Sequence, residues 1–200
     1  MTTDLGLRER KKHETRAAIA RAALDLAVER GPSGVTVDDI AAAAGVSPRT
    51  VFNHFGTKDE AILGISPERR AELLEAVRAR PADEPPLQAI AEVFTTAMTA
   101  SDETATFWLR RAALVAAHPD LRVAQLASQD RLQQELAAVV AERTGLDPDT
   151  DPYPELVVAA ALAALRIALA RAAHAGPDRI RQAIEDAVAV LASGLAPPAS

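Results

Sequence analysis

The sequence contains no cysteine and few aromatic residues. Without cysteine the chain forms no disulfide, holds no metal through thiolates and performs no thiol redox chemistry, a pattern that fits a reducing compartment. Aromatic residues make up only 3% of the 200 positions, whereas hydrophobic residues reach 48% and alanine is abundant. This composition favours helices with close small-residue contacts over a strand-rich fold.

Long uncharged apolar runs are also missing. A membrane-spanning helix needs about 18 or more such residues, and none of the apolar stretches reaches that length without a charge. The first residues, MTTDLGLRERKKHE, pass from polar to charged without the apolar centre of a signal peptide. We therefore expect a cytoplasmic protein with no membrane partner.

Catalytic motifs are absent as well. The sequence has no G-x-S-x-G, no H-E-x-x-H and no glycine-rich phosphate loop, and its four histidines are scattered without the spacing of metal ligands. These absences predict a protein that is not an enzyme and that holds no metal and no cofactor.

The charge is distributed unevenly along the chain. The net charge is -6, yet residues 8–21 carry six Lys or Arg against two Glu, an excess of four positive charges. A basic end on an acidic body suggests binding to nucleic acid through that end. The alternative is that residues 8–21 form only a solvated helix face.

Apolar residues recur with helical spacing nearly everywhere, and no segment has a convincing strand pattern. We expect an all-α fold of about nine helices. The first covers residues 7–29, with an inward stripe of Ile19, Ala23, Leu24, Ala27 and Val28. Two short helices and a longer one follow, and then helices over residues 87–99, 101–115, 119–144, 154–175 and 178–193.

Residues 36–55 carry the signals of two short helices joined by a tight turn. Thr36 and Asp39 have the spacing of a capping box, which starts a helix at Val37. Gly45 ends that helix, and Ser47 followed by Pro48 starts the next one. This arrangement predicts a helix-turn-helix, whose second helix enters the major groove of DNA.

The second helix divides its side chains between two faces. Val51 and Phe55 are predicted to pack inward, because they lie four residues apart. The other face gathers four polar residues suited to bases or phosphates: Arg49, Thr50, Asn53 and His54. After it, Thr57 and Glu60 form a second predicted capping box, and Lys58 begins a helix whose free N–H groups favour a phosphate.

Residues 14–63 resemble the DNA-binding domain of the TetR family of bacterial transcriptional regulators. The resemblance is carried by TRAAIARAALDLAVERG and by TVDDIAAAAGVSPRTVFNHFGTKDEAIL. It implies a DNA-binding domain over residues 1–60 and a larger helical domain for effector binding and dimerisation over residues 61–200. The expected DNA-contacting residues are Thr36, Ser47, Pro48, Arg49, Thr50, Asn53, His54 and Lys58.

One segment departs from the common family pattern. Many members have Leu-Tyr-x-Tyr-Phe where this chain has Val51-Phe52-Asn53-His54-Phe55, so two hydroxyls that often contact the DNA backbone are missing. We expect Phe52 to pack inward and His54 to donate to a phosphate, the alternative for His54 being a merely exposed histidine.

A small-molecule site is predicted between two helices of the larger domain. Most of its candidate residues are large apolar side chains, which are scarce in this chain. One candidate, Arg111, is a basic residue that could bind an anionic group, and Arg110 and His118 are alternatives to it. The expected effector-binding residues are Phe94, Met98, Phe107, Trp108, Arg111, Leu114 and Val115. Each of them also suits an ordinary helical core.

The last two helices, residues 154–175 and 178–193, are predicted to form a homodimer. The first of them is apolar nearly all round apart from Arg166 and Arg171, more than a monomer surface needs, so a four-helix bundle with a second copy is expected. The alternative is that both helices complete the core of the monomer. Arg166 either pairs with Glu185 or Asp186 or reaches the ligand.

A weaker resemblance concerns the effector. The segment from Arg131 to Ala173 is similar to the C-terminal domain of a TetR subgroup that includes the mycofactocin-system regulators, which implies an acyl-CoA-like ligand. The predicted function is a ligand-responsive regulator, most simply a repressor, that binds a palindromic double-stranded DNA operator as a dimer. The alternative is a helical small-molecule carrier or dimeric interaction protein that has lost DNA binding.

Overall fold

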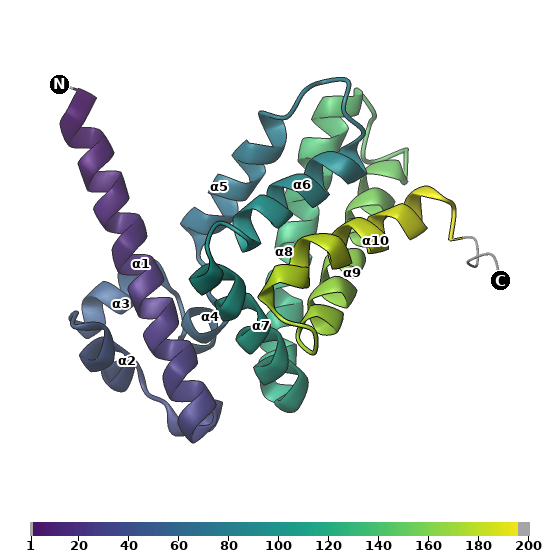
Figure 1. Ribbon diagram of the computed structural model, residues 1–200. Coiled ribbons are helices and arrows are strands. Elements are labelled where there is room, and N and C mark those ends of the chain that lie inside the picture. The colour runs from purple at the N-terminus through teal and green to yellow at the C-terminus, as the bar shows by residue number, and fades with distance from the viewer. Residues whose placement is uncertain (1, 196–200) are drawn as a thin grey trace. The chain divides into compact units, whose positions relative to one another are not determined.

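The computed structural model describes residues 2–195, with side chains from Arg10 onward. Arg8, part of the basic run 8–21, therefore has a side chain outside the described part. Ten α-helices and two short 3₁₀ helices, and no strand, make up the described chain (Figure 1). They are α1 (Thr2–Arg30), η1 (Pro32–Gly34), α2 (Val37–Ala44), α3 (Pro48–His54), α4 (Lys58–Leu63), α5 (Pro67–Arg78), α6 (Pro86–Met98), α7 (Asp102–Ala117), α8 (Pro119–Thr144), α9 (Tyr153–Ala172), η2 (Pro177–Arg179) and α10 (Ile180–Ala192).

The all-α prediction is confirmed, but the longer helix expected after Thr57 is two helices. Gly64 ends α4 in the left-handed conformation, with φ 64°. The hydroxyl of Ser66 then accepts a hydrogen bond from the backbone N–H of Arg69 at 3.1 Å, and Pro67 begins α5. Glycine tolerates the positive φ that stops a helix, and serine followed by proline starts the next, which explains the extra helix.

The chain divides into two compact units. The first unit holds the described residues up to Arg69 together with Leu114–Leu126, and the second holds Arg70–Ala113 and the described residues from Ala127 onward. In the first unit α1 packs against α2 and α4, and α2 packs against α3. Its largest fully buried side chains are Ile19, Leu24, Val35, Ile40, Phe55, Ile62, Leu63 and Leu121.

Two details of the expected packing in the first unit are wrong. Val28 was expected in the inward stripe of α1, but it is 47% exposed, whereas Leu26 is buried. Helical spacing from Ile40 predicts that Ala44, four residues later, is buried as well, but Ala44 is only half-buried and Ala41 takes the inward position. In both helices the periodicity placed one residue just beyond the edge of the stripe that meets its neighbour.

The second unit is built around α6, α9 and α10, which pack against one another. Ile90, Val158, Ile180 and Ile184 are fully buried in its core, and α8 adds Leu136 among others. Alanines at 161, 164, 168 and 172 are buried along α9, and their small side chains let neighbouring helices approach closely. This packing places most of the apolar surface of α9 inside the unit.

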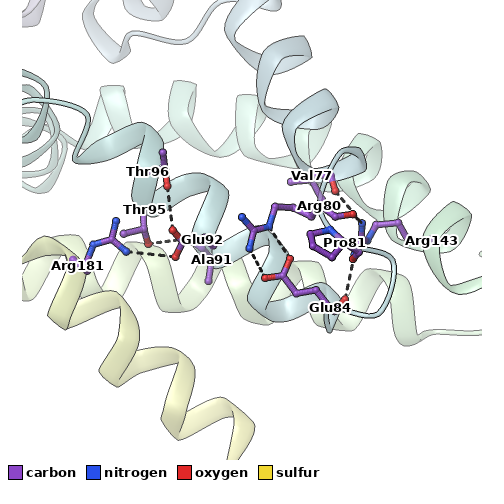
Figure 2. A network of polar contacts seen from close by, with 10 residues as sticks. All are labelled: Val77, Arg80, Pro81, Glu84, Ala91, Glu92, Thr95, Thr96, Arg143 and Arg181. Atoms are coloured by element: carbon purple, nitrogen blue, oxygen red, sulfur yellow. Dashed lines mark hydrogen bonds and ion pairs between the residues drawn. The ribbon is translucent and has the colours of Figure 1, made fainter.

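Two arginines fasten the turn between α5 and α6. Both terminal nitrogens of Arg143 donate to backbone carbonyls, and Figure 2 shows these oxygens gathered around one guanidinium. The carbonyls belong to Val77, Arg80, Pro81 and Glu84, at 3.2, 2.9, 2.8 and 3.1 Å. Arg80 in turn pairs with the Glu84 carboxylate at 2.6 Å. Arg143 thereby joins α8 to the last turn of α5 and to the loop before α6. Two of these carbonyls, those of Val77 and Pro81, also accept from the backbone N–H groups of Arg80 and Glu84.

No helix within residues 2–195 combines the length and the hydropathy that crossing a bilayer requires.

Candidate nucleic-acid interface and ligand site

The start of α2 shows the capping box expected from the sequence. The Thr36 hydroxyl accepts from the backbone N–H of Asp39 at 3.2 Å, and the Asp39 carboxylate accepts from the backbone N–H of Thr36 at 3.0 Å. The Thr36 hydroxyl also donates to the Asp39 carboxylate, and this bond, with the one from the Thr36 backbone N–H and then the charge of Arg30, lowers the pKa of Asp39. The side chain of Thr36 is thus held in place at the entrance of the helix-turn-helix.

The turn between α2 and α3 also follows the sequence signals. Gly45 has φ 66° and ψ 34°, and its N–H and that of Val46 donate to the carbonyls of Ala42 and Ala41. The hydroxyl of Ser47 then accepts from the backbone N–H of Thr50 at 3.1 Å, and Pro48 occupies the first turn of α3. The left-handed glycine turns the chain sharply enough that only three residues separate the end of α2 from the start of α3.

The two faces of α3 differ from the expected ones at two positions. Phe52 was predicted to pack inward and is 56% exposed, whereas His54 was predicted to face DNA and is only 7% exposed. Arg49, Phe52 and Asn53 share the solvent-facing side, since residues i, i+3 and i+4 lie on one face of a helix. Val51 and Phe55 are buried as expected, each 1% exposed.

His54 lies inside the first unit among charged groups of α1 and α5. Burial lowers its pKa; the charge of Glu68 acts against this, and the charges of Lys12 and Arg16 add to it. Glu68 itself forms an ion pair with Lys12 at 3.2 Å. The Nδ1 atom of His54 is buried without a hydrogen-bond partner among the described residues. His54 is therefore a buried residue at the end of α3 that is uncharged at neutral pH.

The second predicted capping box forms only in part. The Thr57 hydroxyl accepts from the backbone N–H of Glu60 at 3.1 Å, but the Glu60 carboxylate accepts from Gly56 at 2.8 Å instead of from Thr57. The ammonium group of Lys58 donates to the carbonyls of Pro32 at 2.7 Å and Val35 at 3.3 Å. Lys58 therefore ties the start of α4 to the segment that precedes α2.

The expected DNA-contacting residues fall into three groups by exposure. Thr50 and Lys58 are half-buried and His54 is buried, while the others face solvent: Thr36, Ser47, Pro48, Arg49 and Asn53. Sequence reasoning missed Phe52. The spacing of Phe52 from Arg49 was the signal that pointed to it, and a preference for burying aromatic side chains hid that signal. Contact with DNA stays a prediction for every member of the set.

The basic run of α1 is partly paired within the protein. Arg10 lies 3.7 Å from Glu14, and a terminal nitrogen of Arg16 lies 2.9 Å from the His13 ring. Arg16 is only 6% exposed. The positive potential that the sequence suggested over residues 8–21 is thus reduced where Glu14 pairs with Arg10 and Glu68 pairs with Lys12.

The expected effector-binding residues do not all belong to one compact unit. Leu114 and Val115 are buried in the first unit, and the other five belong to the second. Phe94 and Met98 are in the core of the second unit, 6% and 5% exposed. The Phe107 and Trp108 rings meet edge to face, 5.7 Å apart at an interplanar angle of 86°.

Arg111 completes this aromatic group on α7. Its guanidinium carbon lies 4.8 Å from the centroid of the Trp108 ring, which allows a cation–π interaction. The side chain is 8% exposed, and its Nε has no hydrogen-bond partner among the described residues. Burial lowers the pKa of Arg111 to about 10. The group thus keeps its charge at neutral pH while lying out of water.

The last two helices leave a set of large apolar side chains in solvent. Leu156, Ile167 and Val190 are 65%, 44% and 50% exposed. Arg166 is exposed as well, and no ion pair joins it to Glu185 or Asp186 within the described part of the chain. Asp186 instead accepts a hydrogen bond from Gln182 at 2.9 Å.

A metal centre has no support in the described residues, where no group of three or more His, Asp or Glu side chains gathers closely enough to hold an ion.

Comparison with known proteins gives two family matches. Residues 19–63 match the family described as bacterial regulatory proteins, tetR family, and residues 84–196 match the MftR C-terminal domain. The TcmR transcriptional regulator of Streptomyces glaucescens is 34% identical over 160 residues, which cover 77% of this chain and 71% of that protein. The transcriptional repressor Rv3405c of Mycobacterium tuberculosis is 49% identical over 51 residues, 26% of this chain and 27% of the relative.

Solved structures show the same fold at low sequence identity. Thermus thermophilus FadR, a TetR-family repressor in complex with lauroyl-CoA, has a TM-score of 0.54 and 23% identity, covering 92% of this chain and 97% of that one. The fatty acid degradation regulator FadR of Bacillus halodurans has a TM-score of 0.57 and 16% identity, covering 90% and 96%. At this level of identity the likeness concerns the fold.

Proposed function

Because the chain belongs to the TetR family and is a ligand-responsive DNA-binding repressor of transcription, we propose that it holds a palindromic operator as a homodimer and releases it when a small apolar anion binds. DNA binding is assigned to residues 1–60 and effector binding with dimerisation to residues 61–200. The proposal places the protein in the cytoplasm with its DNA and assigns it no reaction.

The observation that carries the proposal is the exposed face of α3. Arg49, Phe52 and Asn53 stand in solvent on one side of a short helix whose start and preceding turn are held by Ser47 and Gly45. Arginine is suited to guanine, asparagine to adenine, and an apolar ring to the methyl group of thymine. We assign base reading to these three residues and backbone contacts to Thr36, Ser47, Pro48 and Thr50.

Dimerisation through α9 and α10 is supported by their exposed apolar residues. Leu156, Ile167 and Val190 together offer apolar surface that a second copy would remove from water. A two-fold dimer presents two copies of α3, and major grooves one helical turn apart, about 34 Å, accept such a pair. The operator is accordingly a palindrome.

The effector is expected to be apolar with an anionic group. Phe107 and Trp108 supply aromatic surface, and Arg111 supplies a positive charge beside them. An acyl-CoA or a related acyl compound has this combination. Lauroyl-CoA is a suitable first probe, since it is the ligand in the T. thermophilus protein of the same fold.

Selection from a library of random palindromic duplexes tests the DNA-binding part of the proposal. We expect one palindrome to be enriched and its affinity to fall steeply with salt, because phosphate contacts release counterions. Arg49→Gln should weaken binding and relax the preference at one base pair of each half-site. Failure to enrich any sequence would contradict the proposal and favour a protein that has lost DNA binding.

The dimer has its own test. Sedimentation of the wild-type chain should give twice the mass of one chain, and Leu156→Glu together with Val190→Glu should give monomers. Val123→Glu is a matched control, since Val123 is an apolar residue 69% exposed on α8, outside the proposed interface. A monomeric wild type at micromolar concentration would contradict the proposed assembly.

A further inference from the structure

Arg111 is enclosed in the protein without an acidic partner. Only 8% of it is exposed, and no carboxylate within the described residues forms an ion pair with it. Buried charges in proteins are normally paired and hydrogen-bonded, because leaving water is costly for an ion. The unpartnered Nε of Arg111 departs from this rule. The missing partner is therefore a feature that needs an explanation.

Trp108 stabilises only the face of the Arg111 guanidinium. The ring centroid lies 4.8 Å from the guanidinium carbon, a distance suited to cation–π attraction. The N–H donors of arginine lie in the plane of the group, so a ring over the face does not engage them, and Nε has no hydrogen-bond partner among the described residues. An edge with Nε and a neighbouring terminal nitrogen matches the two oxygens of a carboxylate or phosphate.

Trp108 and Arg111 lie beside apolar side chains of the second unit. Trp108 and Ala112 pack against the core cluster that includes Phe94, Met98 and Leu109. Phe107 meets Trp108 edge to face, so the aromatic surface continues along α7. A ligand that reaches Arg111 therefore finds apolar and aromatic groups beside a permanent positive charge, and burial leaves that charge in place at neutral pH because the pKa stays near 10.

We propose that Arg111 is the anion-binding residue of the effector site, donating from Nε and a terminal nitrogen to a carboxylate or phosphate of an apolar ligand that packs beside Trp108. The inference rests on the proposed effector response, and it adds how the anion is recognised: by paired donation from the unpartnered Nε of Arg111 and a neighbouring terminal nitrogen. Arg111 is kept unpaired in the free protein so that the ligand supplies the missing negative charge.

Tryptophan fluorescence measures this binding directly, because Trp108 is the only tryptophan in the chain. The probes are laurate, dodecyl phosphate and lauroyl-CoA, which share an acyl or alkyl chain and differ in the source of the negative charge, with 1-dodecanol as the uncharged counterpart. We expect at least one anionic probe to change the emission of Trp108 and to bind at least about tenfold more tightly than 1-dodecanol. The strongest of the three identifies the source of the anion.

Two variants of Arg111 separate charge from geometry. Arg111→Met should weaken binding of the anionic probe at least about tenfold, and Arg111→Lys should keep part of the affinity because lysine retains the charge without the paired donors. Arg110→Met is the matched control. Arg110 is the neighbour of Arg111 on the same helix and is exposed, so Arg110→Met should bind the anionic probe as the wild type does. Calorimetric titration repeats the measurement, since these substitutions also alter the emission of Trp108 itself.

Thermal unfolding separates this result from a folding defect. Without a ligand, Arg111→Met should melt at the same temperature as the wild type or higher, because it removes a buried charge without a partner. The anionic probe should raise the melting temperature of the wild type and of Arg110→Met, but not that of Arg111→Met. A variant that is stable and yet insensitive to the probe locates the anion at Arg111.

Equal affinity of wild type and Arg111→Met for the anionic probes, or no binding of any of the three, would overturn the inference. These outcomes are independent of DNA binding, which is measured separately on the selected palindrome without ligand. Arg111→Met should bind that palindrome as tightly as the wild type does. If no palindrome binds while the affinity for the anionic probe still depends on Arg111, the proposed repressor function is wrong and the anion site at Arg111 is still supported.

Discussion

Phe52 and His54 lie two residues apart in α3 and occupy opposite environments, Phe52 being 56% exposed and His54 7% exposed. Two steps along a helix turn the chain by about 200°. The ring of Phe52 is thus directed to solvent beside Arg49 and Asn53, and the imidazole is directed into the first compact unit.

We predict that Phe52 contributes to DNA affinity through thymine methyl groups. Phe52→Ser should weaken binding to the selected palindrome by about 1 kcal/mol, roughly fivefold, because apolar contact is lost while the folded protein loses little packing. Fluorescence anisotropy at fixed salt measures the affinity. Replacing thymine by uracil in the half-site should weaken the wild type and leave Phe52→Ser unaffected.

The control for Phe52 is Val123→Ser, a change of another exposed apolar residue in the same compact unit. Its DNA affinity should match the wild type. If every thymine can be replaced by uracil without effect on the wild type, methyl recognition by Phe52 is wrong.

We predict that burial of His54 makes the first unit sensitive to acid. The pKa of His54 is lowered by burial below the value of 6.5 that applies in the unfolded chain, against the charge of Glu68. The unfolded state then binds a proton more readily, so stability is fully present above about pH 6.5 and falls as the pH drops through this value toward the folded pKa. Urea unfolding at several pH values measures the effect.

His54→Gln should flatten the fall in unfolding free energy between about pH 7 and the lower pKa of the folded state. Val123→Ser, a change without a titratable group in the same unit, is the control and should keep the wild-type pH dependence. A His54→Gln protein with an unchanged pH profile would show that His54 is not the group responsible.

We predict that Lys58 acts mainly on stability. Its ammonium donates to the carbonyls of Pro32 and Val35, so Lys58→Met should lower the unfolding free energy by about 1 to 3 kcal/mol, since two carbonyls lose a charged donor. The salt dependence of DNA binding should keep its slope. Arg49→Gln, by contrast, should leave the unfolding free energy unchanged and weaken DNA binding through the base pair that Arg49 reads. If instead Lys58→Met reduces the salt slope by about one, Lys58 contacts a phosphate in the complex.

We predict that Arg143 is a major stabilising residue of the second unit. Arg143→Met removes a charged donor from four carbonyls, of which only those of Val77 and Pro81 keep a backbone donor, and should lower the unfolding free energy by about 2 to 4 kcal/mol. Arg143→Lys should recover little, because an ammonium lacks the planar fork that reaches several oxygens at once. Chemical denaturation followed by circular dichroism measures both variants.

Arg181→Met provides the comparison for Arg143. Arg181 pairs with Glu92 at 3.4 Å on the surface, where Figure 2 shows it beside α6, and an exposed pair contributes only about 0 to 1 kcal/mol. Equal losses for the two variants would mean that the carbonyl contacts of Arg143 add nothing beyond an ordinary surface charge.

Much of the fold was predictable because its signals are local. The capping box of Thr36, the left-handed turn at Gly45 and the cap at Ser47 each depend on groups within five residues of one another. The break between α4 and α5 had the same kind of signal at Gly64 and Ser66 and was predictable in principle. The helix-turn-helix and the all-α class follow from such signals.

Local signals do not state which face of a short helix meets the rest of the protein. The burial of His54, the exposure of Phe52 and the turn of Lys58 toward Pro32 depend on how the helices of the first unit and the segment before α2 pack against one another. The carbonyls held by Arg143 lie far from it in sequence. No pattern of neighbouring residues could have paired them.

The sequence by itself therefore determined where α2 and α3 begin, where the turn between them lies and which residue types stand on α3. Only the tertiary structure decided which of them face solvent, and that Arg111 is buried beside Trp108 without an acid to neutralise it. The physical reason is the distance along the chain between the groups that interact. Caps and turns arise from hydrogen bonds between near neighbours, whereas burial and pairing arise from segments that meet only when the chain has folded.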